Sequence, residues 1–231
     1  MFRWPRMAGY AAFPVAAVAI VALAAARDAR RPSAWPGGTA ADTIARGRYL
    51  VLTHACGECH GGGDNPAGDG WLAGVMSPTQ IFTIGACEVT PGAKPCFHTY
   101  PRNLTPDNAT GLGRFTERQI FNELRYGVRP EDTPDVTITS TTPGVGNFPE
   151  HPHYLAPPMP WTSWRFMPDG DLWSIAAYLK RAVKPVHNLV PESEGPPDFW
   201  ASDYTADQIG TYPAPPFPTK HEQAAGGTGG Q

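Results

Sequence analysis

Apolar residues recur at helical spacing in three stretches of this 231-residue chain. The first begins at Asp42, a suitable N-cap, and runs through Ile44, Tyr49 and Val51 to a cysteine motif at residues 56–60. These stretches predict a helical domain that begins at about residue 42.

The second and third stretches carry fuller helix signals. Residues 116–127 (TERQIFNELRYG) open with a T-x-x-Q capping box and end at Gly127, a suitable C′ residue. Residues 168–183 (PDGDLWSIAAYLKRAV) are acidic at the start and basic at the end, as the helix dipole favours. The apolar faces of these two helices are expected to contain Phe115, Ile120, Phe121 and Leu124, and Leu172, Ile175, Ala176 and Leu179.

Irregular segments separate and flank these helices. Proline (27) and glycine (25) are abundant, which predicts much irregular chain around a small regular core. Residues 129–158, rich in Pro, Thr and Gly, are not expected to form regular structure. We divide the chain into a signal segment (1–26), a tether (27–41), a folded domain (42–187) and a proline-rich extension (188–231) whose aromatic residues can dock onto another surface.

Composition limits the function classes. With 41% apolar and 17% charged residues the chain can form one compact core. Its net charge of −3 and the lack of a long Lys/Arg run argue against a nucleic-acid-binding surface.

The N-terminus has the features of an export signal. Arg3 and Arg6 precede an uncharged stretch of 20 residues, 7–26, and further arginines follow. This length just suffices for a membrane-spanning helix, whereas the Ala-Leu-Ala sequence at 22–24 also fits a signal-peptidase site. We favour a retained anchor, and the alternative is a soluble protein released by cleavage.

The motif CGECH, residues 56–60, carries the most specific chemistry. In C-x-x-C-H both thiols add across the vinyl groups of haem as thioethers, and the adjacent imidazole reaches the iron. The alternatives are a redox-active dithiol, which would need a preceding strand that the sequence does not predict, or a zinc knuckle. We therefore expect one covalent haem c on Cys56 and Cys59, with His60 as the proximal iron ligand.

Haem c attachment predicts a location outside the cytoplasm, on the periplasmic side of the membrane. In that oxidising compartment Cys87 and Cys96, with eight residues between them, are expected to form a local disulfide. A zinc site with two further ligands is the alternative.

The sixth iron position decides between electron transfer and ligand chemistry. Met159 lies in APPMPW, where the prolines predict an extended segment across the distal face of a haem. Spacing alone does not choose it over a packing role, because methionine often fills gaps in cores. The candidates for this position are Met76, Met159, Met167, His98, His151, His153 and His187.

Three motifs together resemble the class I c-type cytochrome family. They are GRYLVLTHACGECH at 47–60, NLTPDNATGLGRFTERQIFNELRYG at 103–127 and PMPWTSWRFMPDGDLWSIAAYLK at 158–180. It resembles in particular the monohaem cytochrome c subunits and domains attached to membrane dehydrogenases and to respiratory or photosynthetic chains. This resemblance implies an all-α, cytochrome c-like domain in which Met159 is the distal ligand and Gly47 packs against Tyr178.

The resemblance also implies a function. An iron held by His60 and Met159 has no open site, so the chain is expected to transfer single electrons between redox proteins, without catalysing a reaction or binding a small-molecule substrate. It would be a membrane-tethered carrier or a redox subunit of a larger complex. In the family the segment around NLTPD borders the haem propionates, which makes Tyr100, Arg102 and Asn103 candidate propionate contacts.

Two other functions stay open. One is a haem enzyme or gas sensor with an open sixth coordination site. The other is an assembly subunit whose extensions hold neighbouring proteins. Separately, His151 and His153, close to Met159 in the sequence, could replace it as iron ligand or bind a metal, although surface-loop histidines are the commoner case. The insertion at 129–158 and the extension depart from the family pattern, and we expect them to affect partner choice and not haem ligation.

Overall fold

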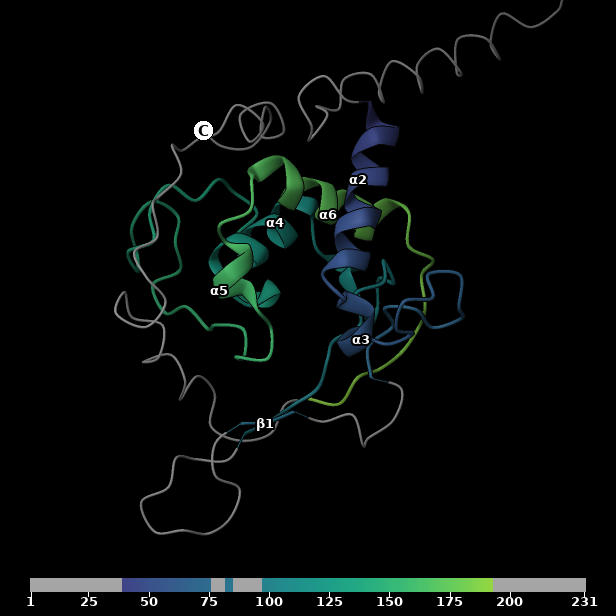
Figure 1. Cartoon of the computed structure of the whole chain (residues 1–231). Coiled ribbons are helices and arrows are strands. Elements are labelled where there is room, and N and C mark those ends of the chain that lie inside the picture. Colours follow the sequence, from purple (N-terminus) through teal and green to yellow (C-terminus); the bar gives the residue numbers. More distant parts are fainter. Residues whose placement is uncertain (1–38, 76–81, 85–96, 193–231) are drawn as a thin grey trace, which may run out of the picture. The chain divides into compact units, whose positions relative to one another are not determined.

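The computed structural model describes residues 39–75, 82–84 and 97–192 (Figure 1). Helices dominate this part of the chain, as predicted, and two three-residue strands form an antiparallel pair that the sequence did not predict. The elements are α2 (Ala40–Thr53), α3 (Cys56–His60), β1 (Phe82–Ile84), β2 (Phe97–Thr99), η1 (Leu112–Arg114), α4 (Glu117–Tyr126), η2 (Pro130–Asp132), α5 (Trp161–Trp164) and α6 (Asp169–Arg181).

Several expectations fall outside the described ranges. They concern the signal segment, the tether up to residue 38, Met76, the pair Cys87 and Cys96, and the extension from residue 193. Among the helices of residues 39–75 and 97–192, none has the length and apolarity needed to cross a bilayer.

The first helix begins at Ala40, and the prediction that Asp42 is its N-cap was wrong. Thr39 is the N-cap, and its hydroxyl accepts a hydrogen bond from the Asp42 backbone N–H at 3.2 Å. The Asp42 carboxylate in turn accepts from the Thr39 backbone N–H at 2.7 Å. Asp42 is therefore the third helical residue of a capping box that starts three positions earlier.

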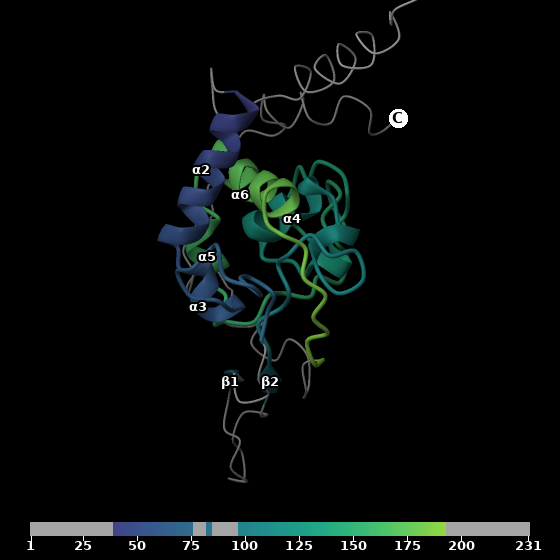
Figure 2. The same ribbon diagram turned by 90° about the vertical axis from the view of Figure 1, so that its right-hand side faces the viewer.

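The helices α2 and α6 make the most extensive contact between elements of the described domain (Figures 1 and 2). They cross at Gly47, where an added Cβ would lie 1.9 Å from the Ser174 carbonyl oxygen and 2.6 Å from the Tyr178 Cβ. The expected contact between Gly47 and Tyr178 is confirmed. An ion pair between Arg46 and Asp171, with bonds of 2.8 and 2.9 Å, joins the same two helices.

The signals of the other two long helices are also confirmed. Thr116 and Gln119 form the predicted capping box of α4, and Gly127 ends the helix in the left-handed conformation, with φ of 68°. Phe121 is fully buried and stacks on Trp173 of α6, with 4.5 Å between ring centroids. Buried side chains on the two predicted faces include Ile120, Phe121 and Leu124, and Leu172, Ile175, Ala176 and Leu179.

The insertion at 129–158 is irregular except for η2, as expected, but it packs onto α4. The buried Asn122 amide donates hydrogen bonds to the carbonyl oxygens of Pro134 and Val136, both at 3.0 Å. Val128 forms an isolated bridge with Tyr154. The insertion shares a small apolar cluster with the end of α4, formed by Tyr126, Val128, Ile138, Phe148 and Tyr154.

The chain continues to pack on the domain beyond residue 187. The Asn188 side-chain amide donates to the carbonyl oxygens of Ala73 at 2.7 Å and Val75 at 3.0 Å, and Val190 is buried. The start of the predicted extension therefore belongs to the folded unit.

Candidate haem-binding site

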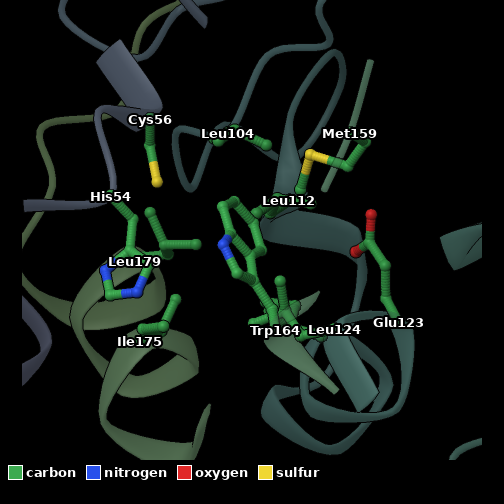
Figure 3. A pocket seen from close by; sticks show the side chains of 11 residues that line it. His54, Cys56, Leu104, Leu112, Glu123, Leu124, Met159, Trp164, Ile175 and Leu179 are labelled. Carbon is green, nitrogen blue, oxygen red and sulfur yellow. The ribbon is translucent and has the colours of Figure 1, made fainter. Parts of the chain in front are cut away.

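An apolar pocket, partly open to solvent, lies among α3, α4, α5 and α6. Figure 3 shows the sulfur atoms of Cys56 and Met159 directed into it from different sides. Two sulfur-bearing residues that the sequence assigned to one cofactor are thus brought together from distant parts of the chain. The lining residues are His54, Cys56, Leu104, Leu112, Ile120, Glu123, Leu124, Met159, Trp164, Ile175 and Leu179.

A sharp change of direction precedes the cysteine motif, of which Cys56 lines this cavity, whereas Cys59 and His60 are not among its lining residues. Ala55, between α2 and α3, has φ of 54°, a left-handed conformation that is strained for a residue with a Cβ. The short helix α3 then carries Cys56, Cys59 and His60 in one turn. Gly57 is required within it, because an added Cβ would lie 2.0 Å from the Gly63 carbonyl oxygen.

A hydrogen bond to a backbone carbonyl fixes the ring of His60. Its Nδ1 lies 2.7 Å from the Arg102 carbonyl oxygen, so Nδ1 carries the proton and Nε2 carries the lone pair that can bind iron. Burial lowers the pKa of His60, against the opposing effect of this hydrogen bond, and so favours the neutral, ligating form. The imidazoles of metal sites are commonly fixed by such a bond to a backbone carbonyl.

The environment of Cys56 argues against a redox-active dithiol. Burial raises the pKa of its thiol to about 12. A reactive dithiol needs a lowered pKa, because the thiolate is the nucleophile. A half-buried cysteine whose sulfur faces an apolar cavity suits a thioether to a cofactor better.

Met159 lines the cavity, but the prediction of an extended segment around it was wrong. The Met159 backbone N–H donates to the Ala156 carbonyl oxygen at 2.9 Å, which closes a turn through the two prolines at 157 and 158. The Trp161 N–H then donates to the Met159 carbonyl oxygen at 2.9 Å, directly before α5. Met167 packs against the main core as a partly buried residue and does not line the cavity.

The three candidate propionate contacts lie beside the motif and are not among the lining side chains. The Arg102 guanidinium donates to the Pro191 carbonyl oxygen and to the Glu192 carboxylate, both at 3.0 Å. The Asn103 amide is buried and bonded to Thr105 and to the Val186 carbonyl oxygen. Tyr100 is half-buried after β2. A role of these residues at the propionates stays a prediction.

The histidines proposed as other ligands have surface environments. His153 pairs with the Asp132 carboxylate at 2.8 Å, and His187 lies 3.5 Å from that of Asp107. His98 contacts the Thr83 hydroxyl in the strand pair, and His151 is exposed.

Three lining residues with polar groups were missed from the sequence: His54, Trp164 and Glu123. His54 Nδ1 bonds to the Leu50 carbonyl oxygen at 2.9 Å, and its ring meets that of Trp164 edge-on. Glu123 is 8% exposed and, within the described part of the chain, its carboxyl group has no hydrogen-bond or salt-bridge partner. Burial and the nearby Glu131 raise the pKa of Glu123 to about 8. The signal in the sequence that could have revealed the burial of Glu123 is its place beside Leu124 on the apolar face of the helix.

Comparison with known proteins finds relatives of one kind. No family model matches the chain. It is 27% identical over 164 residues to the fructose dehydrogenase cytochrome subunit of Gluconobacter japonicus, and 28% identical over 154 residues to the gluconate 2-dehydrogenase cytochrome c subunit of Pantoea cypripedii. These alignments cover 71% and 66% of this chain and 26% of each relative. The chain resembles the cytochrome c subunits of dehydrogenases.

A third relative extends the pattern. The alcohol dehydrogenase (quinone) cytochrome c subunit of Gluconacetobacter polyoxogenes is 25% identical over 143 residues, which cover 62% of this chain and 22% of that subunit. The resemblance to cytochrome c subunits of dehydrogenases predicted from the three motifs is therefore confirmed, and it supports electron transfer as a redox subunit. The chain spans about a quarter of the length of these relatives.

Proposed function

We propose that this chain transfers single electrons through one covalently bound haem c, as a redox subunit of a dehydrogenase complex. The observation that carries the proposal is the cavity into which both the Cys56 and the Met159 sulfur atoms are directed. The cavity is apolar except for a few groups, as a site that holds a haem in a low-dielectric environment requires.

The residues of the chain divide the work at this site. Cys56 and Cys59 would hold the haem through thioethers, and His60 and Met159 would be the protein ligands of its iron. The bound haem supplies a one-electron couple. The Arg102 carbonyl orients His60 and keeps it in the ligating tautomer. Leu104, Leu112 and their neighbours exclude water, and exclusion of water favours a higher reduction potential.

We propose a periplasmic location, with residues 1–26 as a membrane anchor. The uncharged stretch at 7–26 and the arginines before it support this placement, and cleavage with release of a soluble domain is the alternative. The redox partners would then be other proteins of a membrane electron-transport complex. Recovery of the haem-stained band in membranes washed with high salt supports the anchor, and recovery in the soluble periplasmic fraction contradicts it.

The ligation is tested on the full chain matured with haem. We expect one haem per chain, a far-red absorbance from Met-to-iron charge transfer in the oxidised protein, and no rapid carbon monoxide binding in the reduced protein. Met159→Ala should abolish the far-red absorbance and open the iron to carbon monoxide. Met167→Leu is the matched control and should leave both unchanged, because Met167 packs outside the cavity.

Two results would contradict the proposal. A wild-type protein that lacks the far-red absorbance and binds carbon monoxide at once would instead fit the haem enzyme or gas sensor. Retention of covalent haem in the Cys56→Ala, Cys59→Ala double variant would show that the motif is not the attachment site.

A further inference from the structure

Arg125, in the last turn of α4, is a buried cation with partners in two segments that follow Met159. Its side chain is only 4% exposed. One terminal nitrogen donates to the Arg165 carbonyl oxygen, directly after α5. The other forms an ion pair with Asp169, the first residue of α6, whose side chain is 14% exposed. One guanidinium thus joins the end of α4 to both ends of the short connection between α5 and α6.

The same end of α4 holds the chain just before and after Met159. The Leu155 N–H donates to the Gly127 carbonyl oxygen at 2.7 Å. The Trp161 indole lies so close to Gly127 that an added Cβ would be 2.1 Å from it, and the indole stacks on Tyr154 with 5.8 Å between ring centroids. The turn that carries Met159 is therefore flanked by contacts to α4.

We propose that Arg125 is a positioning residue for the distal ligand Met159. This inference rests on the proposed His/Met ligation. By fixing Arg165 and Asp169, the guanidinium sets the path of residues 159–169, and with it the place of the Met159 sulfur in the cavity. Arginine suits this task because its planar fork reaches two acceptors at once, whereas lysine is a single point charge.

If Arg125 only stabilised the fold, its loss should resemble the loss of another ion pair to α6. The chain offers such a pair for comparison. Arg46 forms an ion pair with Asp171 in the first turn of α6, and the Asp171 side chain is 8% exposed. That pair also anchors α6, but it comes from α2, and its two bonds end on Asp171, inside α6 and beyond the connection that Arg125 spans. A general loosening of α6 should follow from either substitution, whereas a displaced Met159 should follow only from loss of Arg125.

The test compares Arg125→Gln, Arg125→Lys and Arg46→Gln in the full-length, haem-loaded protein. The readouts are the far-red absorbance of the oxidised protein, the pH at which it is lost, and the midpoint potential. In Arg125→Gln the equilibrium constant for loss of the absorbance should rise by about tenfold or more, which lowers its midpoint by about one pH unit. Arg125→Lys should shift the midpoint pH in the same direction but by a smaller amount. Arg46→Gln should lower the melting temperature but leave the midpoint pH and the potential unchanged.

Each outcome bears on one claim. A wild-type protein without the far-red absorbance overturns the His/Met ligation and, with it, this inference. If the wild-type protein shows the absorbance and the Arg125→Gln and Arg46→Gln variants lose it at the same midpoint pH, the positioning role alone is overturned. If Arg125→Gln does not accumulate as a folded haem protein, Arg125→Lys decides, and an unchanged midpoint pH in that variant refutes the proposal.

Discussion

Replacing Glu123 by glutamine removes a carboxyl group that is buried at the cavity without a partner in the described chain. Burial raises its folded-state pKa to about 8, from a usual value of 4.5. The folded state therefore binds the proton more tightly than the unfolded state, and stability falls as the pH rises from about 4.5 through about 8. The slope approaches about 1.4 kcal/mol per pH unit within this window.

The magnitude follows from the same two pKa values. Between pH 5 and pH 8 the wild-type protein should lose roughly 3 to 4 kcal/mol relative to Glu123→Gln, which has the same shape and no charge to desolvate. Chemical unfolding of both proteins, with the iron reduced and far-UV circular dichroism as the signal, measures the difference at each pH. The two proteins should differ little at pH 5 and diverge steadily above it.

Glu117→Gln on the same helix is the matched control. Glu117 is paired with Arg181 near the surface, so its loss should cost under about 1 kcal/mol and leave the wild-type pH dependence in place. A constant free-energy difference between wild type and Glu123→Gln from pH 5 to pH 8 would refute the reasoning. It would mean that the carboxyl group has a partner or solvent contact that the fold does not reveal.

Two further predictions concern the backbone. Gly47→Ala should destabilise the protein by about 2 kcal/mol or more, because the new methyl group would collide with the Ser174 carbonyl where α2 crosses α6; denaturant titration measures this, and an unchanged midpoint would contradict the close crossing. Ala55→Gly should raise stability by about 0.5 to 1 kcal/mol by relieving the left-handed conformation before the haem motif, and a lower melting temperature would contradict that strain.

The parts of the fold that were predictable have local causes. The capping box at Thr116 and the left-handed end at Gly127 define α4 from neighbouring residues alone. The error at Asp42 has a local cause too: Thr39 and Asp42 are both good N-caps, and only the helix itself reveals which of them caps and which is the third helical residue. The strands β1 and β2 were missed because three residues are too few to establish an alternating pattern.

The candidate site divides in the same way. Cys56, Cys59 and His60 lie within one five-residue helix, so their spacing alone predicted their common role. Glu123 was missed because a single acidic residue in a helix is normally solvated, and only the tertiary packing around the pocket buries it. The turn at Met159 was missed because the prolines at 157 and 158 suit a turn as well as an extended segment, and only the hydrogen bond from the Met159 N–H to the Ala156 carbonyl oxygen separates the two.

The contacts around this turn change what the insertion at 129–158 means. We expected it to affect partner choice and not haem ligation, yet Tyr154 belongs to it and stacks on Trp161, two residues after Met159. Leu155, also in the insertion, bonds to the end of α4. The length of the insertion itself costs little stability, because the entropy cost of closing a loop grows slowly with its length. Its contacts therefore matter more than its length. An insertion that packs against both α4 and Trp161 can therefore hold the Met159 turn in place, and substitutions within it should alter the distal ligand before they alter haem attachment.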